Sequence, residues 1–161
     1  MDVDIETDVD ARRIADGAGI ESVQIHNGGL CHIDADMVRE ALLQAKFDDC
    51  DLIVLENIGN LVCPAEFDTG AHLKVALLAI PEGDDKPLKY TLMFSSCDVL
   101  VITKIDTAKY FDFDVEKCKE YLAKINPNAK VFVVSSKTGE GVGALADWIY
   151  GKYSEWQEGL K

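Results

Sequence analysis

Leu52-Ile53-Val54-Leu55-Glu56-Asn57-Ile58-Gly59-Asn60-Leu61-Val62-Cys63-Pro64 is the stretch around which this chain is organised. Its first four residues are apolar and two of them are β-branched, which predicts a short buried strand. The strand ends at Glu56, and a loop with a glycine, a cysteine and a proline follows. Ligands of open α/β sheets bind at the carboxyl ends of strands. We therefore expect Glu56 to face Mg²⁺ and the backbone at Gly59 to approach a phosphate. The alternative is a buried strand followed by an ordinary loop.

Short apolar segments recur along the chain and alternate with segments of helical periodicity. The apolar segments predict strands at residues 23–25, 52–55, 74–80, 99–103 and 131–134. Helices are expected at residues 6–17, after Asp34, after Asp114 and from Val142 onward. This alternation is typical of an α/β protein with a mostly parallel sheet and helices on both faces. The length of 161 residues indicates one domain.

The composition limits the kinds of partner that the protein is expected to bind. Lys plus Arg number 16 against 29 Asp plus Glu, so the formal net charge is -13. This balance argues against binding nucleic acid or an anionic membrane surface. No apolar run approaches the roughly 20 residues that a membrane span needs, and the acidic start does not resemble a signal peptide. The five cysteines are an odd, widely spaced set, which indicates reduced thiols in the cytoplasm and not disulfides.

Two polar loops follow consecutive predicted strands. Thr103-Lys104-Ile105-Asp106 ends the first of them. The carboxylate of Asp106 can accept two hydrogen bonds from the ring N–H and the exocyclic amine of guanine, a pair that adenine does not supply. The stem of Lys104 can lie across the base. Ser135-Ser136-Lys137 ends the next strand, where a backbone N–H can meet the guanine carbonyl oxygen. The alternative for the first loop is a strand end with a solvated lysine and aspartate, and for the second it is a helix-capping serine before Gly139. Two such loops at the ends of consecutive strands favour a base reader more strongly than either loop alone.

Three cysteine and histidine residues in loops suggest a metal-binding site. Gly28-Gly29-Leu30-Cys31-His32 and Cys63-Pro64 lie in loops. Two sulfurs and an imidazole form a ligand set suited to Zn²⁺ or Ni²⁺. Three ligands on two loops would leave a coordination position open, which suits a metal in transit. The alternative is two small buried cysteines and a surface histidine. The remaining cysteines fall in helical or strand patterns and are expected to be packing residues: Cys50, Cys97 and Cys118.

The chain begins with an acidic run that includes Asp8 and Asp10. One of these carboxylates could help to hold Mg²⁺. The alternative is a solvated helix N-terminus, where acidic side chains suit the helix dipole.

Four segments together carry a resemblance to a known family: residues 28–32, 56–64, 82–90 and 103–106. They resemble the nickel-incorporation GTPases of the HypB/UreG family, and the match covers nearly the whole chain. The resemblance implies a P-loop GTPase-like fold and a GTP-dependent, homodimeric metallochaperone that helps to load nickel into [NiFe] hydrogenase. Its implied partners are the hydrogenase large subunit and other nickel-insertion accessory proteins.

The resemblance also implies roles for individual residues. The family's metal ligands correspond to Cys31, His32 and Cys63, which would bind Ni²⁺ or Zn²⁺ at the dimer interface. The loop that senses Mg²⁺ and the γ-phosphate corresponds to Glu56 and Gly59.

Two further parts of the family's nucleotide site have counterparts here. The first switch would contain Asp8 or Asp10, and the guanine reader corresponds to Lys104 and Asp106.

One departure from the family concerns the phosphate-binding loop. The 161 residues contain no GxxxxGK[ST] motif, whose backbone amides, lysine and hydroxyl hold phosphates and Mg²⁺. The chain is therefore expected to be the C-terminal part of a single G-domain, residues 1–161, that lacks its P-loop strand. Two functional classes remain open. The first is a GTPase metallochaperone whose P-loop is missing from this sequence through fragment definition, a gene-start error or a split gene. The second is a non-hydrolytic Ni²⁺- or Zn²⁺-binding or interaction module.

Overall fold

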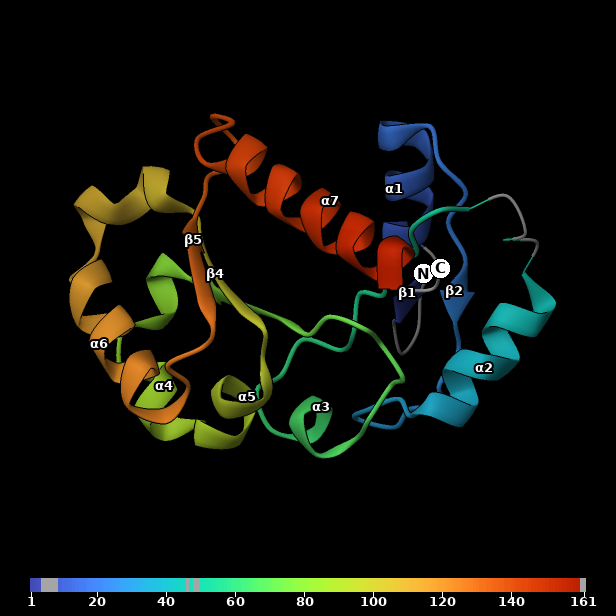
Figure 1. Ribbon diagram of the computed structural model, residues 1–161, viewed down its shortest axis with the longest axis horizontal. Coiled ribbons are helices and arrows are strands. Elements are labelled where there is room, and N and C mark those ends of the chain that lie inside the picture. Colours follow the sequence, from blue (N-terminus) through green and yellow to red (C-terminus); the bar gives the residue numbers. More distant parts are fainter. Residues whose placement is uncertain (4–8, 46, 48–49, 160–161) are drawn as a thin grey trace. The chain divides into compact units, whose positions relative to one another are not determined.

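The computed structural model describes residues 1–3, 9–45, 47 and 50–159. The chain divides into two compact units, Met1–His72 and Leu73–Lys161. Figure 1 shows their helices and strands in sequence colours. The prediction of a single G-domain over residues 1–161 stays a prediction.

Three parallel segments form the centre of the first unit. The strands β1 (Asp2–Val3) and β2 (Gln24–Ile25) pair in parallel, with Asp2 opposite Gln24. On its other side, β1 forms a bridge with Glu56. The Glu56 amide donates to the Met1 carbonyl over 2.9 Å, and the Val3 amide donates to the Glu56 carbonyl over 3.1 Å. The strand predicted at residues 23–25 is confirmed at its last two residues, which form β2.

The segment before Glu56 differs from the prediction of a buried strand. Leu52, Ile53 and Val54 form no strand, and 54%, 41% and 69% of their surfaces are exposed. A strand of a parallel sheet is normally covered on both faces and paired on both edges. The N-terminal amine of Met1 donates to the Val54 carbonyl, and Leu55 packs against the core that contains Val3, Ile25 and Ile33. The prediction of burial is wrong for Leu52, Ile53 and Val54.

Helices complete the first unit. They are α1 (Val9–Ala18), α2 (Ala35–Gln44) and the short α3 (Cys63–Glu66). The carboxylate of Asp34 accepts the Met37 amide over 3.0 Å, which confirms the predicted start of α2. The apolar face of α2 packs on a small core that contains Val3, Ile25 and Ile33.

The second unit is built on a three-stranded parallel sheet. Its strands are β3 (Val75–Ala79), β4 (Val99–Thr103) and β5 (Lys130–Val133), in the order β3-β4-β5. Ala79 pairs with Thr103, and Ile102 pairs with Val133. The carboxyl ends of all three strands therefore lie at one edge, as the sequence predicts. On β3, Ala76 and Leu78 are buried while Val75 and Leu77 are exposed.

Helices lie on both faces of this sheet (Figure 1). Leu145 and Trp148 of α7 (Val142–Gly159) pack on one face, against a cluster that includes Val101 of β4. The other face is covered by α4 (Lys86–Lys89), α5 (Thr91–Ser96) and α6 (Val115–Ile125), which contact one another. Two 3₁₀ helices follow strands: η1 (Ile80–Glu82) and η2 (Ile105–Tyr110). The predicted α/β class with a parallel sheet and helices on both faces is confirmed. In the described parts of the chain, no helix combines the length and the apolar character needed to cross a membrane.

Candidate functional site

The residue that leaves β4 has an unusual backbone conformation. Lys104 has φ 61° and ψ 36°, and it is the one non-glycine residue of positive φ in the described ranges. This left-handed conformation costs a non-glycine residue about 1–2 kcal/mol. The Lys104 carbonyl accepts the backbone N–H and the hydroxyl of Thr107, over 2.9 and 2.7 Å. The turn that carries Asp106 is thus held in one shape, and such strain is commonest at functional sites.

A short side-chain hydrogen bond joins the two predicted base-reading loops. The hydroxyl of Ser135 donates to Oδ1 of Asp106 over 2.6 Å, although the residues are 29 positions apart. Ser135 is fully buried, and its hydroxyl also accepts the amide of Thr138 over 3.2 Å. The Ile105 amide donates to the Val134 carbonyl over 3.2 Å. The carboxylate of Asp106 is therefore held in a fixed orientation at the edge of the sheet.

The loop after β5 is a tight turn that depends on glycine. The Ser135 amide donates to the Glu140 carbonyl over 2.9 Å. Gly141 has φ +71°, and a Cβ built there would lie 2.1 Å from the Val133 carbonyl oxygen. Ser136 and Lys137 are exposed in this turn. The backbone thus presents the predicted Ser135-Ser136-Lys137 loop beside Asp106.

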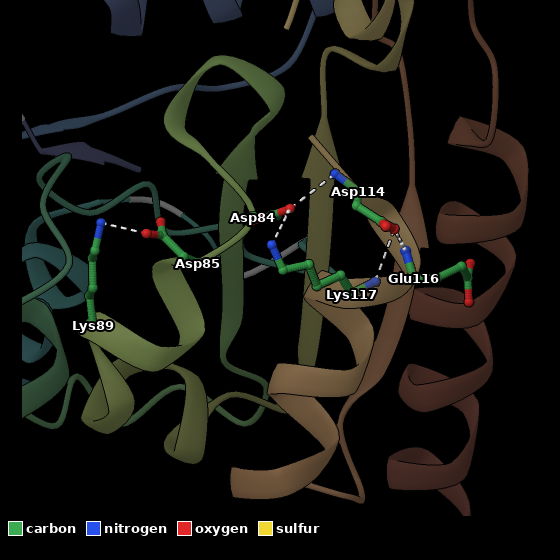
Figure 2. A network of polar contacts seen from close by, with 6 residues as sticks. All are labelled: Asp84, Asp85, Lys89, Asp114, Glu116 and Lys117. Atoms are coloured by element: carbon green, nitrogen blue, oxygen red, sulfur yellow. Dashed lines mark hydrogen bonds and ion pairs between the residues drawn. The ribbon is translucent and has the colours of Figure 1, made fainter. Parts of the chain in front are cut away.

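An acidic loop follows β3 and is tied to α6 (Figure 2). Oδ2 of Asp84 accepts the Asp114 amide over 3.1 Å and lies 3.7 Å from Nζ of Lys117. The charge of Asp84 is the largest cause that raises the pKa of Lys117 above its ordinary value. Asp85, the N-cap residue of α4, forms a neighbouring ion pair with Lys89 at the end of that helix. These contacts fix the segment 82–90, one of the four segments that carried the family resemblance.

Two of the predicted metal ligands meet in the first unit. Sγ of Cys31 and Sγ of Cys63 lie 2.9 Å apart, although the residues are 32 positions apart. Nδ1 of His32 is 3.9 Å from Sγ of Cys31, and its ring stacks on Phe67 with centroids 3.5 Å apart. The hydrogen bond with Cys31 is the largest cause that raises the pKa of the Cys63 thiol, followed by lost solvation.

The other three cysteines separate into two kinds. Burial raises the pKa of both the Cys97 and the Cys118 thiol to about 11, which agrees with their predicted packing role. Cys50 is exposed, so the prediction of a packing role is wrong for it.

Local turns bring the two cysteine loops into position. Gly28 and Gly29 have φ +67° and +83°, a succession that side-chain-bearing residues rarely adopt. The buried Asn27 closes this turn, since its Nδ2 donates to the Leu30 carbonyl over 2.6 Å. Cys63 begins α3, and the following proline suits a first helical turn because it needs no N–H there.

The donor chemistry fits a thiophilic metal, but one copy offers an incomplete set. Two sulfurs bound to one tetrahedral Zn²⁺ at about 2.3 Å are roughly 3.8 Å apart, so the pair must open by roughly 0.9 Å. Among the residues that the structure describes, no three His, Cys, Asp or Glu side chains are arranged to hold a metal ion. The structure thus brings together two of the three predicted ligand side chains, those of Cys31 and Cys63.

The remaining predicted residues are distributed as follows. Glu56 and Gly59 lie in the first unit, each exposed, with Glu56 paired to β1 through its backbone. Asp8 and the side chain of Asp10 lie outside the described residues. Lys104 is exposed at the carboxyl end of β4.

Sequence reasoning missed Asn60, which contacts both cysteine segments. Its Nδ2 donates to the Cys31 carbonyl over 3.1 Å, and its Oδ1 accepts the amides of Val62 and Cys63 over 3.0 and 2.9 Å. The bonds that Asn60 accepts from the amides of Val62 and Cys63 could have been recognised in the sequence, because asparagine side chains commonly accept backbone amides two or three residues further along a turn. No sequence pattern predicts the first bond, because it spans 29 positions.

A hollow of about 470 Å³ lies at the other end of the second unit's sheet. Its lining includes Asp98, Lys130 and Trp148, at the amino ends of β4 and β5 and on α7. Because ligands of parallel sheets bind at the carboxyl ends, the loops after Thr103 and Val133 remain the candidate site.

Parallel sheets flanked by helices make this an α/β protein, and the solved structures similar to it have folds of the P-loop GTPase type. The chain belongs to the CobW/HypB/UreG family, whose nucleotide-binding domain matches residues 3–133.

Individual relatives agree with this family. The chain is 48% identical to the hydrogenase maturation factor HypB of Azotobacter vinelandii over 148 residues, which cover 91% of this chain and 48% of that protein. It is 40% identical to HypB of Escherichia coli (strain K12), over 91% of this chain and 50% of that protein. The chain thus spans about half the length of these curated relatives.

Solved structures agree as well. HypB from Helicobacter pylori in complex with nickel matches with a TM-score of 0.89 and 37% identity, over 96% of this chain and 73% of that one. HypB from Archaeoglobus fulgidus matches with a TM-score of 0.84 and 36% identity, over 94% of this chain and 74% of that one.

Proposed function

We propose that this chain carries the guanine-reading and metal-holding parts of a GTP-dependent nickel metallochaperone that acts in [NiFe] hydrogenase maturation. Its relatives are named as hydrogenase maturation factors, and one similar structure is described as a nickel complex. The observation that carries the proposal is the pair of thiols, Cys31 and Cys63, with sulfurs 2.9 Å apart on segments 32 positions apart.

The metal site is proposed to contain Cys31, His32 and Cys63. Thiolates and imidazole bind Ni²⁺ and Zn²⁺ well, and one similar solved structure is a nickel complex, which favours nickel as the cargo. Because one copy brings two sulfurs together, a second copy would supply the missing ligands, and the metal-site face would be the homodimer interface. Leu30 and Val62, which flank the cysteines, are exposed apolar residues that such an interface would cover.

The nucleotide site is proposed at the carboxyl ends of β4 and β5. Asp106, oriented by Ser135, would accept the two guanine N–H groups, and the Lys104 stem would lie on the base. The backbone around Ser136 and Lys137 would meet the guanine carbonyl oxygen.

A separate role toward Mg²⁺ and phosphate is proposed for residues of the first unit. Glu56, with Asp8 or Asp10, would hold Mg²⁺, and the backbone at Gly59 would approach a phosphate. No phosphate cradle of the GxxxxGK[ST] type occurs in these 161 residues, so GTP hydrolysis is not proposed for them alone. That observation favours a second candidate, a non-hydrolytic Ni²⁺- or Zn²⁺-binding module.

The proposed partners are the hydrogenase large subunit and other nickel-insertion accessory proteins. The five cysteines are all free thiols, which suits action in a reducing compartment such as the cytoplasm.

Nickel titration tests the proposal. The wild-type protein is expected to bind Ni²⁺ against a competing chelator and to become dimeric when the metal is added, as followed by light scattering. Cys63→Ala should abolish both effects, and Cys50→Ala, which removes another exposed thiol, should abolish neither. Equal affinities in the two variants would refute a metal role for the cysteine pair.

A further inference from the structure

We propose that Asn60 is the positioning residue of the metal site: its side-chain amide holds the two cysteine segments together, so that a single metal ion can reach both sulfurs after a small opening of the pair. The inference rests on the proposed metal function and adds to it a residue that does not itself bind the metal.

The argument begins with the three hydrogen bonds of the Asn60 side chain. Nδ2 donates to the carbonyl of Cys31 over 3.1 Å. Oδ1 accepts the amide of Cys63 over 2.9 Å and that of Val62 over 3.0 Å. One planar group therefore binds the backbone of both ligand residues, one through its donor and the other through its acceptor.

These contacts act on the ligands through the backbone. The chain between Cys31 and Cys63 spans 32 positions, so tertiary contacts set the distance between their sulfurs. The stack of His32 on Phe67 also joins the two segments, but Asn60 is the residue that bonds the backbone of both cysteines. The bond to Cys63 also sets the first turn of α3, from which that sulfur projects. A thiol pair held in advance loses less conformational freedom when the metal binds.

The two functions of the amide can be separated by substitution. Asn60→Asp keeps the acceptor for Cys63 but replaces the donor with an oxygen that repels the Cys31 carbonyl. Asn60→Ala removes both. Asn57 is a matched control in the same loop. Its Oδ1 also accepts a backbone amide, that of the neighbouring Ile58 over 2.8 Å, but this bond does not involve either cysteine segment.

The first measurement is Ni²⁺ binding. Groups that orient metal ligands typically contribute about 10- to 100-fold to affinity. We expect Asn60→Ala to lose affinity in that range, Asn60→Asp to lose less, and Asn57→Ala to match the wild type. The sulfur-to-nickel charge-transfer band should also change per bound metal in Asn60→Ala. If Asn60 acted in folding alone, Asn60→Ala would yield less folded protein but the same band per bound metal. That result would refute the proposal.

The second measurement needs no nickel. Phenylarsine oxide binds two neighbouring thiols together and releases one water, so its capture rate reports how closely Cys31 and Cys63 are held. In a Cys50→Ser background, capture should be slower in Asn60→Ala than in Asn57→Ala by about tenfold or more, on the same scale as other ligand-orienting contacts. Equal rates would refute the positioning role. If the capture rate depends on Asn60 but the wild-type protein binds no nickel, the positioning role stands and the proposed metal function is refuted.

Discussion

The hydrogen bond between Ser135 and Asp106 allows a quantitative test of how the nucleotide edge is built. Ser135→Ala removes a hydroxyl that donates to the Asp106 carboxylate over 2.6 Å and accepts the Thr138 amide over 3.2 Å. The methyl group that remains fits the space, because Ser135 is fully buried and alanine is smaller. The variant therefore isolates the two hydrogen bonds.

The expected loss follows from those two bonds. A hydrogen bond to a charged group contributes about 1.5–3 kcal/mol, and the Thr138 amide, which is partly accessible, adds about 0.5–1 kcal/mol. Together the free energy of unfolding should fall by about 2–4 kcal/mol. For a protein of this size each 1 kcal/mol lowers Tm by roughly 2–4 °C, so Tm should fall by roughly 4–16 °C.

The assay is thermal and urea unfolding of wild type, Ser135→Ala and Ser96→Ala. Ser96 is an exposed serine of α5 whose hydroxyl donates to the Met93 carbonyl of the same helix over 3.2 Å. Its replacement should change the free energy of unfolding by less than about 0.5 kcal/mol. A Ser135→Ala protein as stable as Ser96→Ala would refute the inference that this bond holds the two loops together. If the loops form the guanine reader, Ser135→Ala should also lower the preference for guanine over adenine nucleotides.

The remaining predictions concern strain, titration, nucleotide binding and folding. Lys104→Gly should raise the free energy of unfolding by about 1 kcal/mol, because glycine adopts the left-handed conformation without strain, and urea unfolding would detect it; a loss of stability would contradict the strain argument. Cys97 and Cys118 have pKa values of about 11 in the folded protein against an ordinary 9.0, so their contribution to stability is present below pH 9 and should be lost as pH rises to 11. Urea unfolding between pH 9 and pH 11 should show the free energy of unfolding falling as pH rises. A Cys97→Ala, Cys118→Ala double variant should lose less stability over the same range. The 161-residue chain should bind labelled GTP in Mg²⁺ only weakly, since it contains no GxxxxGK[ST] motif, and sub-micromolar affinity would contradict this. Val75 and Leu77 are exposed on β3, so the isolated chain should melt broadly or aggregate; a sharp melt from a monodisperse sample would show that the sheet is stable as it is.

Much of the fold could be predicted from sequence because local periodicity reports burial directly. The apolar run at Val99–Thr103 is the central strand β4, and Asp114 begins α6, both as predicted. The same reasoning was wrong at Leu52, Ile53 and Val54, which are apolar yet exposed. An apolar run predicts that a segment can be buried, but its burial also requires neighbours on both faces.

For the candidate site, the sequence by itself determined which residue types stand at strand ends and in glycine or proline loops. Lys104 and Asp106 directly follow a strand, and Cys31 and Cys63 lie beside residues that turn the chain. Both features are local, so the pattern of neighbouring residues was sufficient to predict them.

Only the tertiary structure decided which of these residues meet and in what orientation. It placed the Ser135 hydroxyl on Asp106 and the Asn60 amide between the two cysteine segments, each across 29 positions. It also placed Lys104 in a left-handed conformation that its own side chain does not favour. Such contacts depend on strand register and on how long loops close, and these are set by packing across the whole unit. A sequence pattern that extends over a few residues contains no information on either.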